Sequence, residues 1–164
     1  MSGEASQSQA LADDLERRFP EDTSVQFNYL PALRGLGTLN HNEPAKAIEL
    51  LQTARSHELS VTGSTFFAFF GMFYPVYFRG EAYLATHQGA EAAKQFQTIL
   101  DHRGLAFNDP IGALAHLQLG RAIALSGDKA KAKTAYENFP KLWKEADPEI
   151  PILKRARTEY AKLD

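Results

Sequence analysis

The chain has no cysteine among its 164 residues, which excludes disulfides, thiolate nucleophiles and most structural zinc sites. It also lacks an excess of one charge, because 18 basic residues are interspersed with 20 acidic ones. A nucleic-acid surface needs a clustered basic patch, so we expect no nucleic-acid partner. The five histidines are dispersed and form no i, i+4 pair, so we expect no metal site and no cofactor.

A long hydrophobic run is also missing. No charged residue lies between Glu58 and Arg79, but five polar or glycine positions occupy the first third of this window. The solid apolar part, 66–78, is shorter than the roughly 20 residues of a membrane span, although eight of its residues are aromatic. We therefore expect no membrane span and a buried helix that continues backward from Tyr74, with a kink near Gly71 caused by Pro75.

The remaining pattern is helical. Apolar residues recur at spacings of three and four, and no segment alternates as a strand does. Clusters of Gly, Pro, Asn and Asp, such as NHNEP at 40–44 and ADPEIP at 146–151, separate about eight predicted helices. The polar, acidic N-terminal segment lacks the features of a secretory signal, so we expect a cytoplasmic protein. The fold class predicted is all-α.

Three segments repeat when they are placed in register: PALRGLGTLNHNEPAKAIELLQTA from Pro31, VYFRGEAYLATHQGAEAAKQFQTI from Val76 and HLQLGRAIALSGDKAKAKTAYENF from His116. Each has glycine fifth, alanine seventeenth and a large apolar residue twenty-first. The residues at these places are Gly35, Ala47 and Leu51; Gly80, Ala92 and Phe96; and Gly120, Ala132 and Tyr136. The small residues would let two antiparallel helices approach closely, and the large ones would fill the gap toward the next pair. Such pairs must stack to bury their apolar faces.

This register resembles the tetratricopeptide repeat (TPR) family. The resemblance implies an α-solenoid of stacked antiparallel helix hairpins, formed as one domain over 1–164. Its parts would be a partial repeat at 6–21, repeats at 28–61, 73–106 and 113–146, and a capping helix at 150–163. The chain departs from the family pattern in its glycine spacings of 45 and 40 residues, and the usual Trp place holds Pro31, Val76 and His116.

Longer stretches resemble, less specifically, the C-terminal TPR segments of bacterial eukaryotic-like Ser/Thr protein kinases and related regulators. These stretches are QFNYLPALRG (26–35), YPVYFRGEAYLATHQGAEAA (74–93), DPIGALAHLQLGRA (109–122) and LWKEADPEIPILKRARTEYAKL (142–163). The segment HRGLAFND has Gly104 where a kinase catalytic loop has its Asp. We therefore expect no enzyme activity. A periplasmic location would apply to a fragment of a membrane-anchored kinase.

The TPR resemblance implies a noncatalytic module that binds a protein or peptide on its concave face. Carried over place by place, the partner-binding residues are Tyr29, Leu36, Asn40, Tyr74, Tyr77, Glu81, Leu84, Leu117 and Arg121. This lining is largely apolar and lacks the Lys and Asn set of the family's carboxylate clamp. The occupant could equally be the chain's own terminal helices or a second copy in a homodimer. As an alternative function, the aromatic segment 66–78 could bind a small molecule or lipid.

Arg34 and Arg79 precede the glycine in two repeats, so the repeat register predicts that they lie along one line of the fold. One interpretation is a pair of cations that contact an anionic group of a partner. The favoured interpretation is that each packs along apolar neighbours and pairs with a nearby acid such as Glu81 or Glu49.

Overall fold

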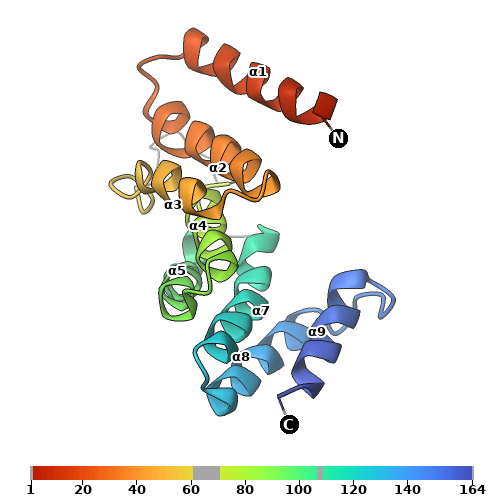
Figure 1. Ribbon diagram of the computed structural model, residues 1–164. Helices are drawn as coiled ribbons and strands as arrows, with labels where there is room; N and C mark the ends of the chain where they lie inside the picture. The colour runs from red at the N-terminus through yellow and green to blue at the C-terminus, as the bar shows by residue number, and fades with distance from the viewer. Residues whose placement is uncertain (1, 61–70, 107–108, 164) are drawn as a thin grey trace.

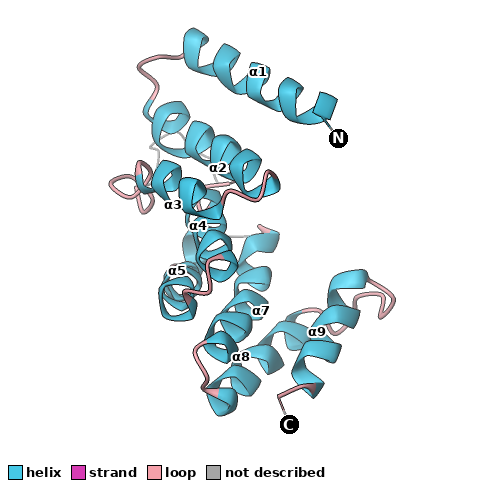
Figure 2. Ribbon diagram, in the orientation of Figure 1, coloured by secondary structure: helices cyan, strands magenta, loops and turns pink. Residues whose placement is uncertain are grey.

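The computed structural model describes residues 2–60, 71–106 and 109–163, and every regular element in these ranges is helical (Figure 1). Figure 2 shows these helices joined by loops, without a strand in the described ranges. The elements are α1 (Ser2–Arg18), the π-helical turn η1 (Val25–Tyr29), α2 (Leu30–Asn40), α3 (Pro44–Gln52), α4 (Tyr74–Ala85), α5 (Gly89–Asp101), α6 (Arg103–Ala106), α7 (Pro110–Leu125), α8 (Lys129–Leu142) and α9 (Pro151–Ala161). The predicted all-α class is confirmed.

Local sequence explains where the helices begin. Proline lies in the first turn of four of them, where its missing N–H removes no helical hydrogen bond. These prolines are Pro44, Pro75, Pro110 and Pro151. Pro31 differs, because α2 continues η1 without a break and Pro31 therefore lies inside a longer helical stretch. Two aspartates cap further N–H groups: Asp109 accepts from the Ile111 N–H at 3.0 Å, and Asp128 accepts from the Lys131 N–H at 3.0 Å.

The helices pack mainly against their neighbours in chain order. α1 packs on α2, α2 on α3, α3 on α4, α4 on α5, α5 on α7, α7 on α8, and α8 on α9. In addition, α2 contacts α4 and α4 contacts α7, so these three helices lie side by side. We call the surface that they share the α2–α4–α7 face. Figure 1 shows the result as an elongated molecule with α1 at one end and α8 and α9 at the other.

Three glycines mark close contacts between helices. A Cβ atom added to any of them would collide with the large residue at the twenty-first place of the same repeat. The pairs are Gly35 with Leu51, Gly80 with Phe96 and Gly120 with Tyr136, at closest distances of 2.7, 2.5 and 2.7 Å. The large residue therefore covers the glycine of its own helix pair, whereas the sequence predicted that it fills the gap toward the next pair.

The aromatic segment differs from its prediction. Gly71 has a φ angle of 92° and α4 begins at Tyr74, so no continuous helix runs back through Gly71. Pro75 lies in the first turn of α4, where it starts the helix without bending it, so the predicted kink is wrong. Phe73 and Tyr77 are buried, and the earlier aromatics at 66–70 lie outside the described residues. Of the described helices, none combines the length and apolar character needed to cross a membrane.

Candidate functional site

The nine residues predicted for partner binding lie on η1, α2, α4 and α7. Tyr29, at the junction of η1 and α2, and Asn40, at the end of α2, are exposed. The half-buried members of the set are Leu36, Tyr74, Glu81, Leu84 and Arg121. The helices α2, α4 and α7 therefore bring six of the nine side chains to positions with accessible surface, and η1 brings a seventh, Tyr29.

The other two predicted residues, Tyr77 and Leu117, belong to the core. Tyr77 is 7% exposed and its ring packs edge-on against Phe96 at 5.7 Å between centroids. Leu117 is fully buried in a cluster with Phe139 and Leu153. Neither side chain has an open surface for a partner, so their predicted role is corrected to packing. The helical register placed them on the correct helices but could not show how deeply α9 and α7 cover them.

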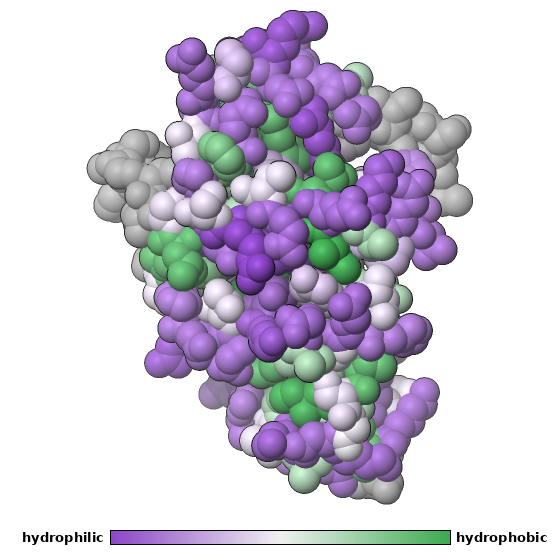
Figure 3. Space-filling view, turned by 60° about the vertical axis from the view of Figure 1, so that its left-hand side comes forward, coloured by the Kyte–Doolittle hydropathy of each residue, from purple (hydrophilic) through white to green (hydrophobic). Residues whose placement is uncertain are grey.

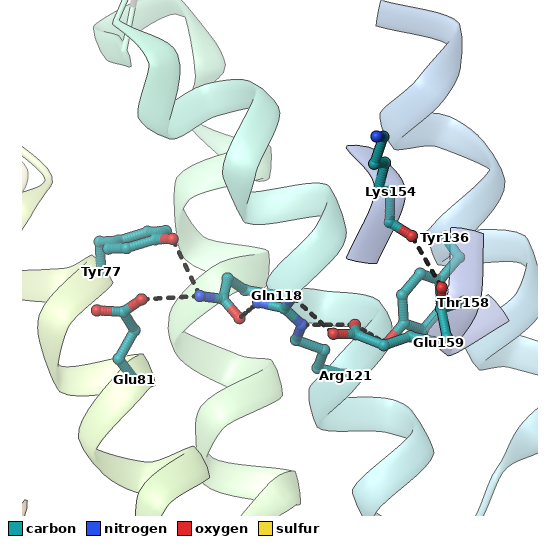
Figure 4. Close-up of polar contacts among 8 residues, drawn as sticks. All are labelled: Tyr77, Glu81, Gln118, Arg121, Tyr136, Lys154, Thr158 and Glu159. Atoms are coloured by element: carbon teal, nitrogen blue, oxygen red, sulfur yellow. Dashed lines mark hydrogen bonds and ion pairs between the residues drawn. The ribbon is translucent and has the colours of Figure 1, made fainter. Parts of the chain in front are cut away.

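A chain of polar contacts crosses from α4 over α7 to α9 (Figure 4). The Gln118 amide donates to the Tyr77 hydroxyl at 3.0 Å and to the Glu81 carboxylate at 2.8 Å. Arg121 donates to Gln118 Oε1 at 3.1 Å and to both carboxylate oxygens of Glu159, at 2.7 and 2.9 Å. Such a bidentate pair has fixed geometry as well as charge attraction. We call these residues, together with Tyr136, the polar chain.

Tyr136 of α8 completes the polar chain by donating its hydroxyl to Glu159 Oε2 at 3.0 Å. The ring of Tyr136 is the one that covers Gly120. One residue therefore fixes both the closest approach of α7 and α8 and the position of the α9 carboxylate.

The two carboxyl groups of the polar chain have opposite pKa shifts. Burial raises the pKa of Glu81, and the nearby Tyr77 hydroxyl, Arg121 charge and Gln118 amide offset this only in part. Burial also acts to raise the pKa of Glu159, but the hydrogen bonds and charge of Arg121 outweigh it and lower that pKa. Of these two groups, the fold therefore destabilises the charged form of Glu81 and stabilises the charged form of Glu159, which is ionised at neutral pH.

Arg34 and Arg79 make internal ion pairs. Arg34 of α2 donates to Glu16 at 2.7 Å and to Asp13 at 3.1 Å, which ties α1 to α2. Arg79 is 1% exposed, and its guanidinium donates to three internal acceptors. These acceptors are Gln95 Oε1 at 2.8 Å, the Leu51 carbonyl at 2.9 Å and Glu58 at 2.6 Å. The structure thus places Arg79 inside the fold, away from any surface where a partner's anion could reach it.

The partners of the two arginines are not the acids Glu81 and Glu49 named from the sequence. The partner of Arg79 lies in the segment after α3, 21 residues earlier in the chain. A helical repeat pattern gives the spacing within a helix pair, but it does not fix the path of the residues between pairs. Only the three-dimensional path of those residues brings Glu58 to Arg79.

Sequence reasoning missed three members of the polar chain: Gln118, Tyr136 and Glu159. A signal for two of them was present, because Pro-Ile begins both α7 and α9, and Gln118 and Glu159 each lie eight residues after the proline. Aligning α9 with α7 would have placed Glu159 at the position of Gln118. The sequence identified Tyr136 only as a packing residue, because the repeat pattern predicts a large apolar side chain at this place and does not predict a hydrogen bond from its hydroxyl.

The accessible apolar surface is divided. Figure 3 shows one side of the molecule, where hydrophobic residues (green) form separate patches among hydrophilic ones (purple). Exposed large apolar side chains also come from different elements: Leu11 of α1, Tyr29 of η1, Leu33 of α2, Leu125 of α7 and Leu142 of α8. A partner that binds here would therefore combine small apolar contacts with polar ones.

Among the described residues, no group of three or more His, Asp or Glu side chains is placed to hold a metal ion. The polar chain consists of an ion pair, one amide, the carboxyl group of Glu81 and two phenols, which are hydrogen-bonded to one another. Its arrangement can position helices and offer hydrogen bonds to an occupant. No protein-family model, curated protein or solved structure matches this chain, so the family resemblance rests on the repeat register alone.

Proposed function

We propose that the chain is a noncatalytic interaction module of the TPR type, an α-solenoid that binds a peptide or helix of a partner protein on the α2–α4–α7 face. Three equivalent glycine contacts support the repeated helix pair most strongly. Gly35, Gly80 and Gly120 occupy the fifth place of the register, and each contacts the large residue at the twenty-first place, although that residue is Leu, Phe or Tyr. Three matching contacts at three repeats are the pattern expected of stacked equivalent units.

The chemistry of the face supports a helix or extended peptide as the occupant. Tyr29 and Leu36 offer apolar contact near α2, and Leu84 offers it on α4. The polar chain lies next to them, with Glu81 and Arg121 only half-buried. An amphipathic segment would place its apolar residues against the first group and a hydrogen-bonding group against the second. Tyrosine suits this role because it combines a large rigid ring with a polar end.

The resemblance to kinase-linked TPR segments extends the proposal. In that role the chain is the sensory or scaffolding part of a cytoplasmic Ser/Thr kinase or related regulator, and it brings the catalytic part to a protein partner. Finding a kinase domain in the same reading frame would support this extension. A chain that is encoded alone would leave the binding proposal in place and remove the link to a kinase.

Site-specific photo-crosslinking tests the binding face. A photoreactive phenylalanine would replace Leu36 or Leu84 in the tagged chain, and crosslinking would be performed in the cells that naturally produce it. Matched controls carry the same group at Lys94 or Gln97, which are exposed on α5 outside the face. We expect one shared protein adduct from the two face positions and none from α5. Equal adducts at all four positions, or adducts only on α5, would contradict the assignment of this face.

A further inference from the structure

A hollow lies between α8 and α9, at the end of the molecule opposite α1. Its floor is apolar and its rim carries Glu137 and Arg157. The lining residues used below are Phe139, Pro140, Leu153, Ala156 and Tyr160. Phe139, Leu153 and Ala156 are already buried by contacts between α8 and α9, so the hollow is a shaped depression rather than a loose gap.

The hollow corresponds, one helix pair later in the chain, to the site between α5 and α7 where α8 packs. Ala135 of α8 belongs to the core cluster that contains Ile99 of α5 with Ala115 and Leu119 of α7. The corresponding residues one step later are Phe139 of α8 with Ala156 and Tyr160 of α9. The shared Pro-Ile start of α7 and α9 fixes this correspondence. The hollow therefore has the construction of a seat for one more helix, which no described helix fills.

The opposite end of the molecule has a helix that lacks a neighbour. In the described chain α3, α5 and α8 each pack against a helix on both sides, whereas α1 packs only on α2 and η1. Leu11 and Leu15 of α1 and Phe19, just after its end, are spaced by four residues, and Leu15 packs partly on the cluster of Ala12, Val25 and Leu30. Leu11 is 62% exposed and Phe19 is 42% exposed. Leu11 and Leu15 also border an open hollow with Leu33 of α2.

The charges of the two ends are complementary. α1 contains four acidic and two basic residues, whereas α8 and α9 together contain seven basic and two acidic ones. Of the two acids, Glu159 is committed to the polar chain. In α1, Asp13 and Glu16 pair with Arg34, but their side chains remain 57% and 45% exposed. Arg157, on the rim of the hollow, is exposed. An acidic helix with an apolar stripe therefore fits this end better than a basic one would.

We propose that a second copy of this chain fills the hollow, by placing its α1 on α8 and α9 with Leu11 in the depression and Arg157 beside the acids of α1. The two surfaces lie at opposite ends of one molecule (Figure 1), so the contact joins different copies. The contact is heterologous, because each copy contributes its α8–α9 hollow to one neighbour and its α1 to another. Such contacts continue from copy to copy unless a rotation closes them into a ring.

Two end-blocking variants test this contact by sedimentation velocity. Leu11→Arg removes the exposed apolar side chain of α1 and adds a positive charge to this acidic helix. Arg157→Glu reverses the charge at the hollow. Both positions are exposed, so both variants should fold. Lys94→Glu and Gln97→Arg make the matched charge changes on the exposed surface of α5. Circular dichroism would verify that all variants keep the helical signal of the wild type.

We expect wild type and both α5 controls to sediment as species that grow with concentration beyond a dimer. Raising salt from 0.15 to 1 M, which shortens the Debye length from about 8 to about 3 Å, should shift them toward monomer. Each end-blocked variant should be monomeric alone. An equimolar mixture of the two should form a 1:1 dimer and nothing larger, because each retains the surface that the other lacks.

Three outcomes would overturn the proposal. Wild type that stays monomeric at every concentration would mean that α8 and α9 receive a different partner or none. A closed dimer that survives Leu11→Arg would show that α1 is not the occupant. Two blocked variants that fail to combine, while wild type still associates, would show a contact through other surfaces.

Discussion

Replacing Gly80 with alanine should destabilise the protein, although alanine is the better helix former. The new Cβ would lie 2.5 Å from Cζ and 2.7 Å from Cε1 of Phe96, whose ring is fully buried. Overpacking of a filled core costs about 1–3 kcal/mol, and this contact is short enough for the upper end of that range. The gain in helix propensity is about 1 kcal/mol. The net loss in the free energy of unfolding is therefore about 2 kcal/mol.

Gly37 provides the matched control, because it also lies inside a helix but a Cβ there meets nothing within 4 Å. Gly37→Ala should stabilise the protein by about 0.5–1 kcal/mol, through propensity and lower unfolded-state entropy. Phe96→Leu should lose stability alone by opening a cavity, but combined with Gly80→Ala it should lose less than the sum of the two changes. Contacting residues couple in this way by about 0.5–3 kcal/mol.

Urea unfolding followed by circular dichroism measures these differences. With a slope of about 2 kcal/mol/M, the Gly80→Ala midpoint should fall by roughly 1 M, while that of Gly37→Ala should rise. The reasoning would be refuted if both alanine variants were stabilised equally, because then the missing Cβ of Gly80 would have no packing role. Additive loss in the double variant would likewise show that Phe96 is not the group that collides.

Two further changes probe the polar interior. Arg79→Met should lower the free energy of unfolding by about 3 kcal/mol in the same urea assay, since it leaves three buried or half-buried acceptors without their donor. A loss of no more than about 0.5 kcal/mol, which is typical of a surface substitution, would contradict this prediction. Glu81→Gln should gain stability relative to wild type as pH rises from below 4.5, the ordinary pKa of Glu, through the raised folded pKa of Glu81. Over this range wild type must bury a newly charged carboxylate, whereas the variant has no charge at this position. The amide oxygen of the variant can still accept a hydrogen bond from Gln118. Thermal melts of both proteins between acidic and neutral pH would measure the difference, and a wild-type advantage that grows with pH would refute the sign.

The sequence predicted the helices and their repeat because both depend on local spacing. Glycine, proline and aspartate fix where helices begin and end, and the register of Gly35, Gly80 and Gly120 predicts the close contacts between helices. The direction of the large residues was less accurate, because one-dimensional spacing cannot tell which of two adjacent helices a side chain covers. Phe96 reaches both its own pair and the helix that follows.

The parts that sequence could not supply depend on the segments between repeats. The π-helical turn η1 keeps the apolar spacing of an α-helix closely enough that periodicity does not distinguish them. The positive φ of Gly71 is a property of one residue, and the helix that apolar content alone predicts to run backward from Tyr74 does not continue through it. Burial of Tyr77 and Leu117 follows from how α7 and α9 cover them, which is a tertiary effect.

The polar chain has a mechanical consequence for the α2–α4–α7 face. Hydrogen bonds lose strength steeply when donor and acceptor turn away from each other, whereas apolar contacts have no preferred direction. The bonds through Gln118 and Arg121 therefore fix how far α4, α7 and α9 can rotate against one another. Among the described residues, no side-chain hydrogen bond links α2 to α4. The α2 side of the face is held to α4 differently, by packing and through α3, which the bonds from Arg79 to the Leu51 carbonyl and from Gln52 to Tyr83 tie to α4. An occupant of the face therefore meets helices whose relative rotation is restrained on both sides of α4.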